Sequence, residues 1–420
     1  MNKTRRYPVA QHVGHHTNPL FLAVLLLMCA LPSALSAQSF KQVTDQDLYP
    51  ADIKTGAERT EVYFPWIRGK NVAIVANHTA TIGTVHLVDS LVHAGMKVKK
   101  VFCPEHGFRG KSEAGENIDN GVDKATGLPL ISLYGATRKP AAQDLEGIDV
   151  VLFDIQDVGA RFYTYISTLH YMMEACAENG KTLIVLDRPN PNGYYIDGPV
   201  LKKEFTSFVG VDPIPIVHGL TIAEYACMVN GELWLKDSVI CNLKYVTVLN
   251  YNHASYYHLP VKPSPNLPNM SSVWLYPSLC LFEGTIVSLG RGTDTPFQVY
   301  GHPLLKEANI TFTPHDIPGM ATNPPLEDTL CNGYDLREFS DAFIKSSGQL
   351  YLFWIIDAYN RLKDQPKFFN AAFDKLAGTD ELRNQILSGV SEEDIRKSWE
   401  KDLAAYKKIR KKYLLYPDFE

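Results

Sequence analysis

The 420-residue sequence lacks the glycine patterns that bind nucleotides. The first apolar run that indicates a strand, residues 72–76, is followed by one glycine within residues 77–83, and neither G-x-G-x-x-G nor G-x-x-x-x-G-K-[ST] occurs. A dinucleotide or a nucleoside triphosphate is therefore not expected, and we expect no cofactor. The G-x-S-x-G and H-E-x-x-H motifs of serine hydrolases and zinc proteases are absent too.

Clusters of like charge and paired cysteines are also missing. The net charge is −5 and the lysines and arginines are spread along the chain, which argues against nucleic acid as a partner. The seven cysteines are scattered, without the C-x-x-C pairs or histidine spacing of zinc sites. Apart from Cys29 they lie mostly in apolar surroundings, so we expect buried free thiols and no metal.

A long apolar run occurs only near the N-terminus. Residues 20–31 are apolar, basic residues precede them and small residues follow. This pattern predicts a signal peptide over 1–37 that is removed on export to the periplasm or the medium, after which no transmembrane segment is expected. An uncleaved anchor is one alternative, and lipid attachment at Cys29 is a weaker one.

What the sequence does contain is a series of buried strands that alternate with helices. Residue patterns predict strands at 72–76, 98–103, 129–134, 149–154 and 182–186, and helices at 85–94, 141–145 and 163–179. Strands that are apolar throughout and separated by helices indicate an α/β fold with a parallel sheet covered on both faces.

The chain is too long for one compact core, so two domains are expected. Its character changes near residue 250, where a polar and aromatic stretch leads into a proline-rich segment at 260–268. We therefore predict an N-terminal domain at 38–250 and a C-terminal domain at 251–420. Within the second domain the patterns predict a strand at 285–289 and helices at 349–362, 380–387 and 391–413.

Polar side chains follow the predicted strands. They are Asn77, Glu105 and His106, Asp154 with Gln156 and Asp157, and Arg188 with Asn190. The carboxyl ends of parallel strands meet at one edge of a sheet, where ligands bind. One carboxylate at a strand end is often only a helix cap, but four such strand ends favour a functional site.

The segment after Pro104 has several side chains of types that act in catalysis. It presents the carboxylate of Glu105, the imidazole of His106 and the guanidinium of Arg109, and the glycine-rich stretch that follows adds Glu116. Two carboxylates from one loop suit a polar active site, whereas a solvated charged loop is the alternative.

Four motifs resemble those of the bacterial exo-β-N-acetylmuramidases of the NamZ type. They lie at 104–110, 154–165, 187–193 and 282–294. The resemblance covers nearly all of the chain after the signal. It implies a hydrolase that removes β-1,4-linked N-acetylmuramic acid from the non-reducing ends of peptidoglycan fragments. It also implies a Rossmann-like N-terminal domain, a smaller α/β (α+β) C-terminal domain and an active site in the cleft between them.

Glycoside cleavage needs a proton donor for the leaving oxygen and a second group that stabilises or attacks the anomeric carbon. We predict Glu105 and Glu116 for these roles, with His106 tuning or relaying a proton. The sequence leaves retention and inversion open. The substrate's own acetamido group is an alternative nucleophile, in which case Asp154 or Asp157 would polarise it.

We predict a larger set of residues to bind the saccharide. They are Asn77, Arg109, Asp154, Gln156, Asp157, Arg161, Tyr163, Arg188, Asn190 and Arg291. Muramic acid differs from glucosamine by an ionised lactyl group, which a guanidinium holds through two parallel hydrogen bonds. Arg291, between two glycines, is the first candidate for this contact and Arg188 the second; a structural pair with Asp294 is the alternative for Arg291.

Two rival functions remain at this level. A solute-binding protein without turnover has the same two-lobed architecture, and only the carboxylates argue for catalysis. A metal-dependent hydrolase would use Glu105, His106, Asp154 and Asp157 as ligands. The expected partners are peptidoglycan-derived saccharides, and the sequence does not define the oligomeric state.

Overall fold

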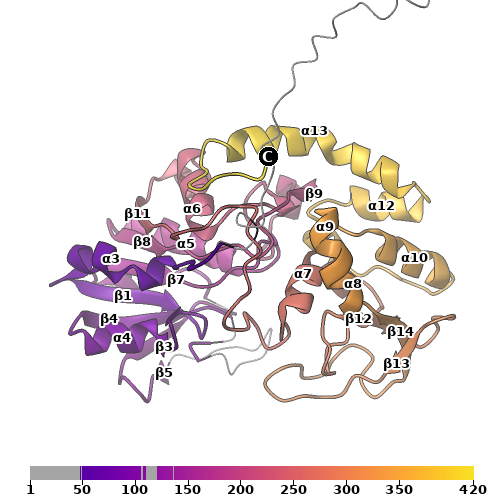
Figure 1. Cartoon of the computed structure of the whole chain (residues 1–420), viewed down its shortest axis with the longest axis horizontal. Helices are drawn as coiled ribbons and strands as arrows, with labels where there is room; N and C mark the ends of the chain where they lie inside the picture. Colours follow the sequence, from indigo (N-terminus) through magenta and orange to yellow (C-terminus); the bar gives the residue numbers. More distant parts are fainter. Residues whose placement is uncertain (1–47, 49, 106, 110–120, 136) are drawn as a thin grey trace, which may run out of the picture. The chain divides into compact units, whose positions relative to one another are not determined.

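The computed structural model describes residues 48, 50–105, 107–109, 121–135 and 137–420, all within one compact unit, Val43–Glu420 (Figure 1). The predicted signal peptide, His106 and Glu116 lie outside the described residues. In the part of the chain that is described, no helix is both long and apolar enough to cross a membrane.

A seven-stranded sheet forms the centre of the N-terminal part. Its order is β11 (Asn242–Val246), β8 (Thr182–Leu186), β7 (Val150–Asp154), β1 (Asn71–Ala76), β4 (Lys97–Cys103), β6 (Pro129–Ser132) and β5 (Gly121–Val122). All neighbours pair in parallel except β5 and β6, which are antiparallel. The chain runs outward from β1 in both directions, so the sheet is doubly wound and has its switch point at β1. This confirms the predicted α/β fold.

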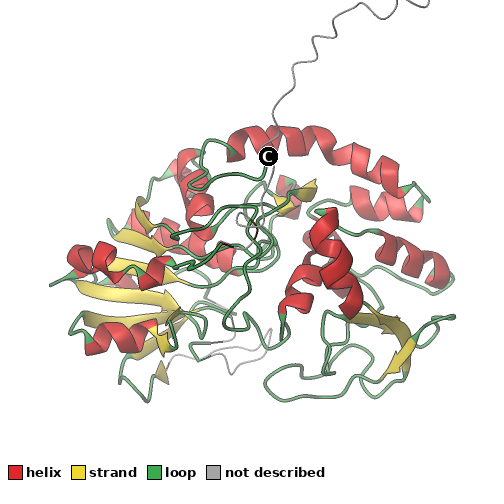
Figure 2. Ribbon diagram, viewed as in Figure 1, coloured by secondary structure: helices red, strands yellow, loops and turns green. Residues whose placement is uncertain are grey.

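Helices cover both faces of this sheet (Figure 2). Alternate residues of β1 point to opposite sides, and each side has its own apolar core. Helices α3 (Thr60–Ile67) and α4 (Leu87–His93) contribute to one core, and α5 (Tyr165–Glu178) and α6 (Ile222–Gly231) to the other. Because both faces are buried, the strands are apolar throughout.

The C-terminal part is smaller and mixes helices with an antiparallel sheet. The sheet has the order β12 (Val299–His302), β14 (Cys331–Asp335) and β13 (Ile310–Phe312). The longer helices are α7 (Met270–Leu279), α10 (Phe353–Leu362), α12 (Glu381–Leu387) and α13 (Glu392–Arg410). The shorter strands and α-helices are β2 (Thr81–Ile82), β3 (Val85–His86), β9 (Asp197–Val200), β10 (Pro215–Val217), α8 (Arg337–Phe339), α9 (Lys345–Ser347) and α11 (Phe373–Ala377).

Two predicted elements differ from the structure. The strand predicted at 285–289 was wrong, because this stretch forms only isolated bridges, from Thr285 to Phe369 and from Ser288 to Gly301. The two bridges join different partners, so no continuous ladder forms, and Val287 and Leu289 line a pocket. The helix predicted at 141–145 is a single 3-10 turn, Ala142–Leu145.

The cysteines confirm the predicted state. The six that the structure describes are all free; five are buried and Cys227 is half-buried. Burial raises the pKa of the Cys103 thiol to about 12, which keeps it protonated and unreactive.

Candidate active site

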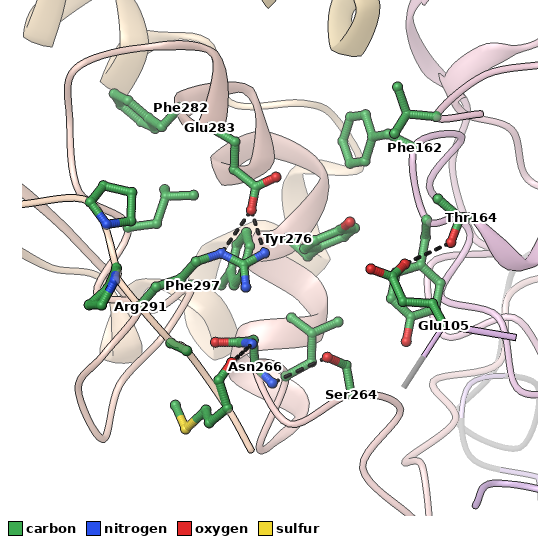
Figure 3. A pocket seen from close by; sticks show the side chains of 18 of the residues that line it. Glu105, Phe162, Thr164, Ser264, Asn266, Tyr276, Phe282, Glu283, Arg291 and Phe297 are labelled. Carbon is green, nitrogen blue, oxygen red and sulfur yellow. Dashed lines mark hydrogen bonds and ion pairs between the residues drawn. The ribbon is translucent and has the colours of Figure 1, made fainter. Parts of the chain in front are cut away.

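A pocket of about 520 Å³ lies between the sheet's strand-end loops and the C-terminal part. One wall includes Glu105 and residues 162–164, and the other is built from residues between 264 and 325. Figure 3 shows Glu105 and Thr164 on one side, with Glu283 and Arg291 across from them. The pocket therefore combines segments from both parts of the chain.

Glu105 stands where β4 ends. The strand's last three residues are buried and Pro104, which has no backbone N–H, ends the run, so the next side chain leaves the core. Thr164, the N-cap of α5, donates a hydrogen bond from Oγ1 to Glu105 Oε2 at 3.0 Å. The carboxylate is thus oriented by a residue of its own wall, at the start of α5.

Aromatic side chains join the two walls. Tyr163 donates a hydrogen bond from its hydroxyl to the carbonyl of Pro263 at 2.8 Å. The rings of Phe162 and Tyr163 both pack edge-on against Tyr276, with centroids 5.4 and 5.7 Å away. These rings give the pocket an apolar surface suited to the C–H faces of a sugar.

Arg291 lies in the opposite wall, as part of an ion pair. Its Nε donates to Glu283 Oε1 at 2.9 Å and its Nη2 donates to the same oxygen. The guanidinium carbon lies 4.9 Å from the centre of the Phe297 ring. Arg291 therefore pairs with Glu283 and not with Asp294, so the alternative of a structural pair with Asp294 was wrong. Arg291 does line the pocket.

Two charged residues of the pocket were not among the predicted site residues. Glu283 lies within the fourth family-like motif, eight residues before Arg291, and its place in that motif was the signal that could have identified it. Arg138 lies on a loop after β6, with its guanidinium carbon 4.5 Å from the centre of the Phe208 ring. No motif pointed to it.

Asp154 and Arg188 form a buried pair outside the residues that line this pocket. Arg188 donates from Nε to Asp154 Oδ1 at 2.6 Å and from Nη2 to Oδ2 at 2.9 Å. A second bond from Nη2 reaches the carbonyl of Thr81 at 3.1 Å. Since both oxygens of Asp154 accept from Arg188, the metal-ligand role considered for Asp154 loses support.

Arg109 binds two aspartates of other segments. It donates to both oxygens of Asp89 at 3.1 Å and to Asp123 at 3.3 and 2.9 Å. Asp123 follows β5, so the pair joins the chain on either side of residues 110–120. Arg109 does not belong to the lining of the pocket.

Arg161 is completely buried, and every described group that its guanidinium binds is a backbone carbonyl. Nη1 donates to Pro199 O at 2.9 Å and Ile214 O at 2.8 Å, while Nη2 donates to Leu376 O at 2.9 Å. Burial lowers the pKa of Arg161 to about 9. Its contacts are those of a structural clamp.

The remaining predicted residues hold the strand-end loops together. Asn77 accepts two bonds from Thr79, and Gln156 donates to the carbonyls of Asp157 and Pro189 at 2.8 Å. Asp157 Oδ2 accepts from the backbone N–H of Gly159 at 2.6 Å, and Asn190 donates to Leu220 O at 2.9 Å.

Of the predicted site residues that the structure describes, it brings Glu105, Tyr163 and Arg291 together around the pocket. The other described residues of that set do not line the pocket, and saccharide contacts for them stay a prediction. Among the described residues no group of three or more histidine, cysteine or acidic side chains is placed to hold a metal ion.

Comparisons with known proteins agree on one family. The model for "Exo-beta-N-acetylmuramidase NamZ, N-terminal" matches residues 72–271, and the model for its C-terminal domain matches residues 274–416. A relative from Bacillus subtilis strain 168, the peptidoglycan beta-N-acetylmuramidase NamZ, is 36% identical over 418 residues, which cover 94% of this chain and 98% of the relative.

Solved structures show the same fold. A DUF1343 family protein from Bacteroides fragilis NCTC 9343 superposes with a TM-score of 0.81 and 48% identity, over 88% of this chain and all of that one. A second DUF1343 protein from the same organism has a TM-score of 0.74 and 30% identity, over 87% of this chain and 99% of its own. The chain belongs to the exo-β-N-acetylmuramidase NamZ family.

Proposed function

We propose that this protein hydrolyses the β-1,4 bond of terminal N-acetylmuramic acid in peptidoglycan fragments, with Glu105 as a catalytic carboxylate. The observation that carries the proposal is the position of Glu105, oriented by Thr164 in a pocket built from both family-matched segments. Family membership supports the reaction class, and the smallest natural substrate would be the disaccharide of N-acetylmuramic acid and N-acetylglucosamine.

In the proposed reaction Glu105 acts directly at the scissile bond. It either protonates the leaving oxygen or stabilises the positive charge that develops at the anomeric carbon. Glu116 is the proposed second carboxylate, and His106, next to Glu105 in the sequence, is proposed to tune or relay a proton. The substrate-assisted alternative through Asp154 is less favoured, because Arg188 binds both oxygens of that carboxylate.

The pocket also supports recognition of the lactyl group. Arg188 is buried against Asp154, whereas Arg291 lines the pocket and uses only Nε and Nη2 for Glu283. We therefore keep Arg291 as the proposed partner of the lactyl carboxylate.

Incubation with a chromogenic β-N-acetylmuraminide and its N-acetylglucosaminide counterpart tests the function. We expect release of the chromophore from the muraminide, with much slower release from the glucosaminide. Binding of the muraminide without any release would favour the solute-binding alternative. Loss of hydrolysis on chelation, with recovery on adding a metal, would favour the metal-dependent one.

The proposed location is the periplasm or the medium, after removal of residues 1–37. Cell fractionation followed by N-terminal sequencing of the mature protein tests this proposal. A mature chain that starts near residue 38 in the exported fraction is expected, whereas retention of residues 1–37 in the membrane fraction would favour an anchor.

A further inference from the structure

Glu283 places a second carboxylate in the pocket, across from Glu105 (Figure 3). Its side chain is 32% exposed and that of Arg291 is 21% exposed. Both bonds from Arg291 end on Oε1. Among the described residues Oε2 is approached only by the Cys280 thiol, with Sγ 3.9 Å away, which is a weak donor. One strong acceptor of Glu283 therefore lacks a strong donor.

The pair is held in place from several directions. The Glu283 carbonyl accepts from Asn370 Nδ2 at 3.1 Å, and Arg291 lies against the Phe297 ring. Gly292 has φ +78°, and a Cβ at this position would lie 2.4 Å from the carbonyl oxygen of His315. The close packing of the Arg291 loop therefore requires glycine here.

The shape of the sugar connects the two carboxylates. In a pyranose ring the anomeric carbon and the carbon that bears the 4-hydroxyl are opposite each other. If Glu105 acts at the anomeric carbon, the 4-hydroxyl points toward the far wall of the pocket. The Glu283–Arg291 pair occupies that wall.

We propose that Glu283 accepts a hydrogen bond from the free 4-hydroxyl of the terminal sugar and thereby restricts cleavage to chain ends. This inference rests on the proposed function. An internal sugar has a glycosidic oxygen at this position, which has no proton to donate and would face a carboxylate. Such a sugar would leave the acceptor unpaired, and its preceding sugar would have to pass through the ion pair.

The lactyl group fits the same wall. It is attached to the carbon next to the one that bears the 4-hydroxyl, and Arg291 lies next to Glu283. The guanidinium therefore stands between the substrate carboxylate and Glu283, where it attracts both. Glu283 would thus bind the 4-hydroxyl, and Arg291 would bind the lactyl group on the neighbouring carbon of the same sugar.

The test compares two substrates and two proteins. The substrates are a chromogenic β-N-acetylmuraminide and its 4-deoxy analogue, and the proteins are the parent and Glu283→Ala. A hydrogen bond to a charged group is worth roughly a 10- to 150-fold change in kcat/KM. We expect the parent's kcat/KM to be lower by this factor for the 4-deoxy substrate than for the substrate with the 4-hydroxyl. For the substrate with the 4-hydroxyl, we expect the kcat/KM of Glu283→Ala to be lower than the parent's by the same factor. Glu283→Ala should therefore cleave both substrates at similar rates.

Glu392→Ala is the matched control. Glu392 pairs with Arg396 at 2.9 Å, and the side chains are 31% and 21% exposed, as in the Glu283–Arg291 pair, but they do not line the pocket. This variant should keep the parent's discrimination between the two substrates. If Glu283→Ala does not fold, Glu283→Gln replaces it, and a weakened discrimination is then expected.

The outcomes separate the inference from the proposed function. A Glu283 variant that discriminates against the 4-deoxy substrate as strongly as the parent would overturn the inference, even if its activity is lower on both. A parent protein that cleaves neither substrate would overturn the proposed function as well. Equal cleavage of both substrates by the parent would overturn the inference alone.

Discussion

The hydroxyl of Thr164 lies 3.0 Å from Oε2 of Glu105 and donates a hydrogen bond to it. Thr164, the N-cap of α5, follows β7, whereas Glu105 follows β4, and β1 lies between these two strands in the sheet. The geometry of the carboxylate therefore depends on two crossover connections of the sheet meeting at one edge.

Glu105→Gln should reduce turnover of a β-N-acetylmuraminide by at least about a hundredfold, since positioned proton transfer contributes roughly 10²- to 10⁴-fold. The substitution removes an ionisable group and no core volume, so the unfolding midpoint should stay close to that of the parent. Steady-state kinetics and thermal unfolding measure the two effects. Activity within a few-fold of the parent would contradict the assignment of Glu105.

Arg291→Lys should weaken use of the muramic substrate by about 1.5–3 kcal/mol, the range for hydrogen bonds to charged groups. Lysine keeps the positive charge but cannot form two parallel bonds to a carboxylate. Residual cleavage of the glucosaminide should barely change, because that sugar has no lactyl group. Equal losses in kcat/KM on both substrates would instead assign Arg291 to the fold or to the chemistry.

Asp154→Asn should act on stability. The carboxylate is fully buried against Arg188, and breaking a buried pair by removing one charge costs about 3–5 kcal/mol. Denaturant unfolding gives the change in the free energy of unfolding. Asp357→Asn is the control, because its pair with Arg361 is partly exposed and should be worth about 1 kcal/mol or less. A stable Asp154→Asn protein that no longer binds saccharide would restore the predicted binding role.

Stability should fall as the pH rises from about 6.5 to about 9, in part because of His170. Burial lowers the pKa of this imidazole, but hydrogen bonds to Asp212 at 2.9 Å and Glu174 at 3.3 Å outweigh burial and raise the pKa to about 9. The folded pKa exceeds the unfolded value, so the contribution is fully present below about pH 6.5 and is lost through pH 9.

Thermal unfolding between pH 6 and 10 tests the His170 contribution, with His170→Gln as the comparison. The difference in stability between parent and variant should shrink across this range, because glutamine does not titrate. A difference that is independent of pH would mean that His170 is not held in its charged form.

The sheet and the position of Glu105 could be predicted from the sequence, because both depend on local residue patterns. Buried strands leave continuous apolar runs, and the end of such a run at Pro104 marks where a polar side chain leaves the core. The far wall of the pocket could not be predicted in this way. Glu283 becomes a pocket residue only because a 3-10 turn and the Arg291 loop fold back on each other, and this contact leaves no periodic signal.

The arginines show a second limit of predicting site residues from the sequence. Arg109, Arg161 and Arg188 occupy family-like motifs, which favoured a role in binding, yet the structure uses each to hold a loop or a segment. A motif marks residues whose replacement is costly. It does not distinguish a side chain that meets the substrate from one that supports the loop behind it.

The contacts of Arg161 with backbone carbonyls determine which N-terminal and C-terminal segments of this family are compatible with each other. Its guanidinium forms no ion pair with any residue that the structure describes, and one of its three carbonyl partners, Leu376, belongs to the segment matched by the C-terminal family model. Nε of Arg161 already has no hydrogen-bond partner among the described residues, so an N-terminal segment without that carbonyl would keep a buried cation with a further unmet donor. The two segments are thus expected to be inherited together, and exchange of C-terminal halves between distant relatives should succeed only where the backbone at this position is preserved.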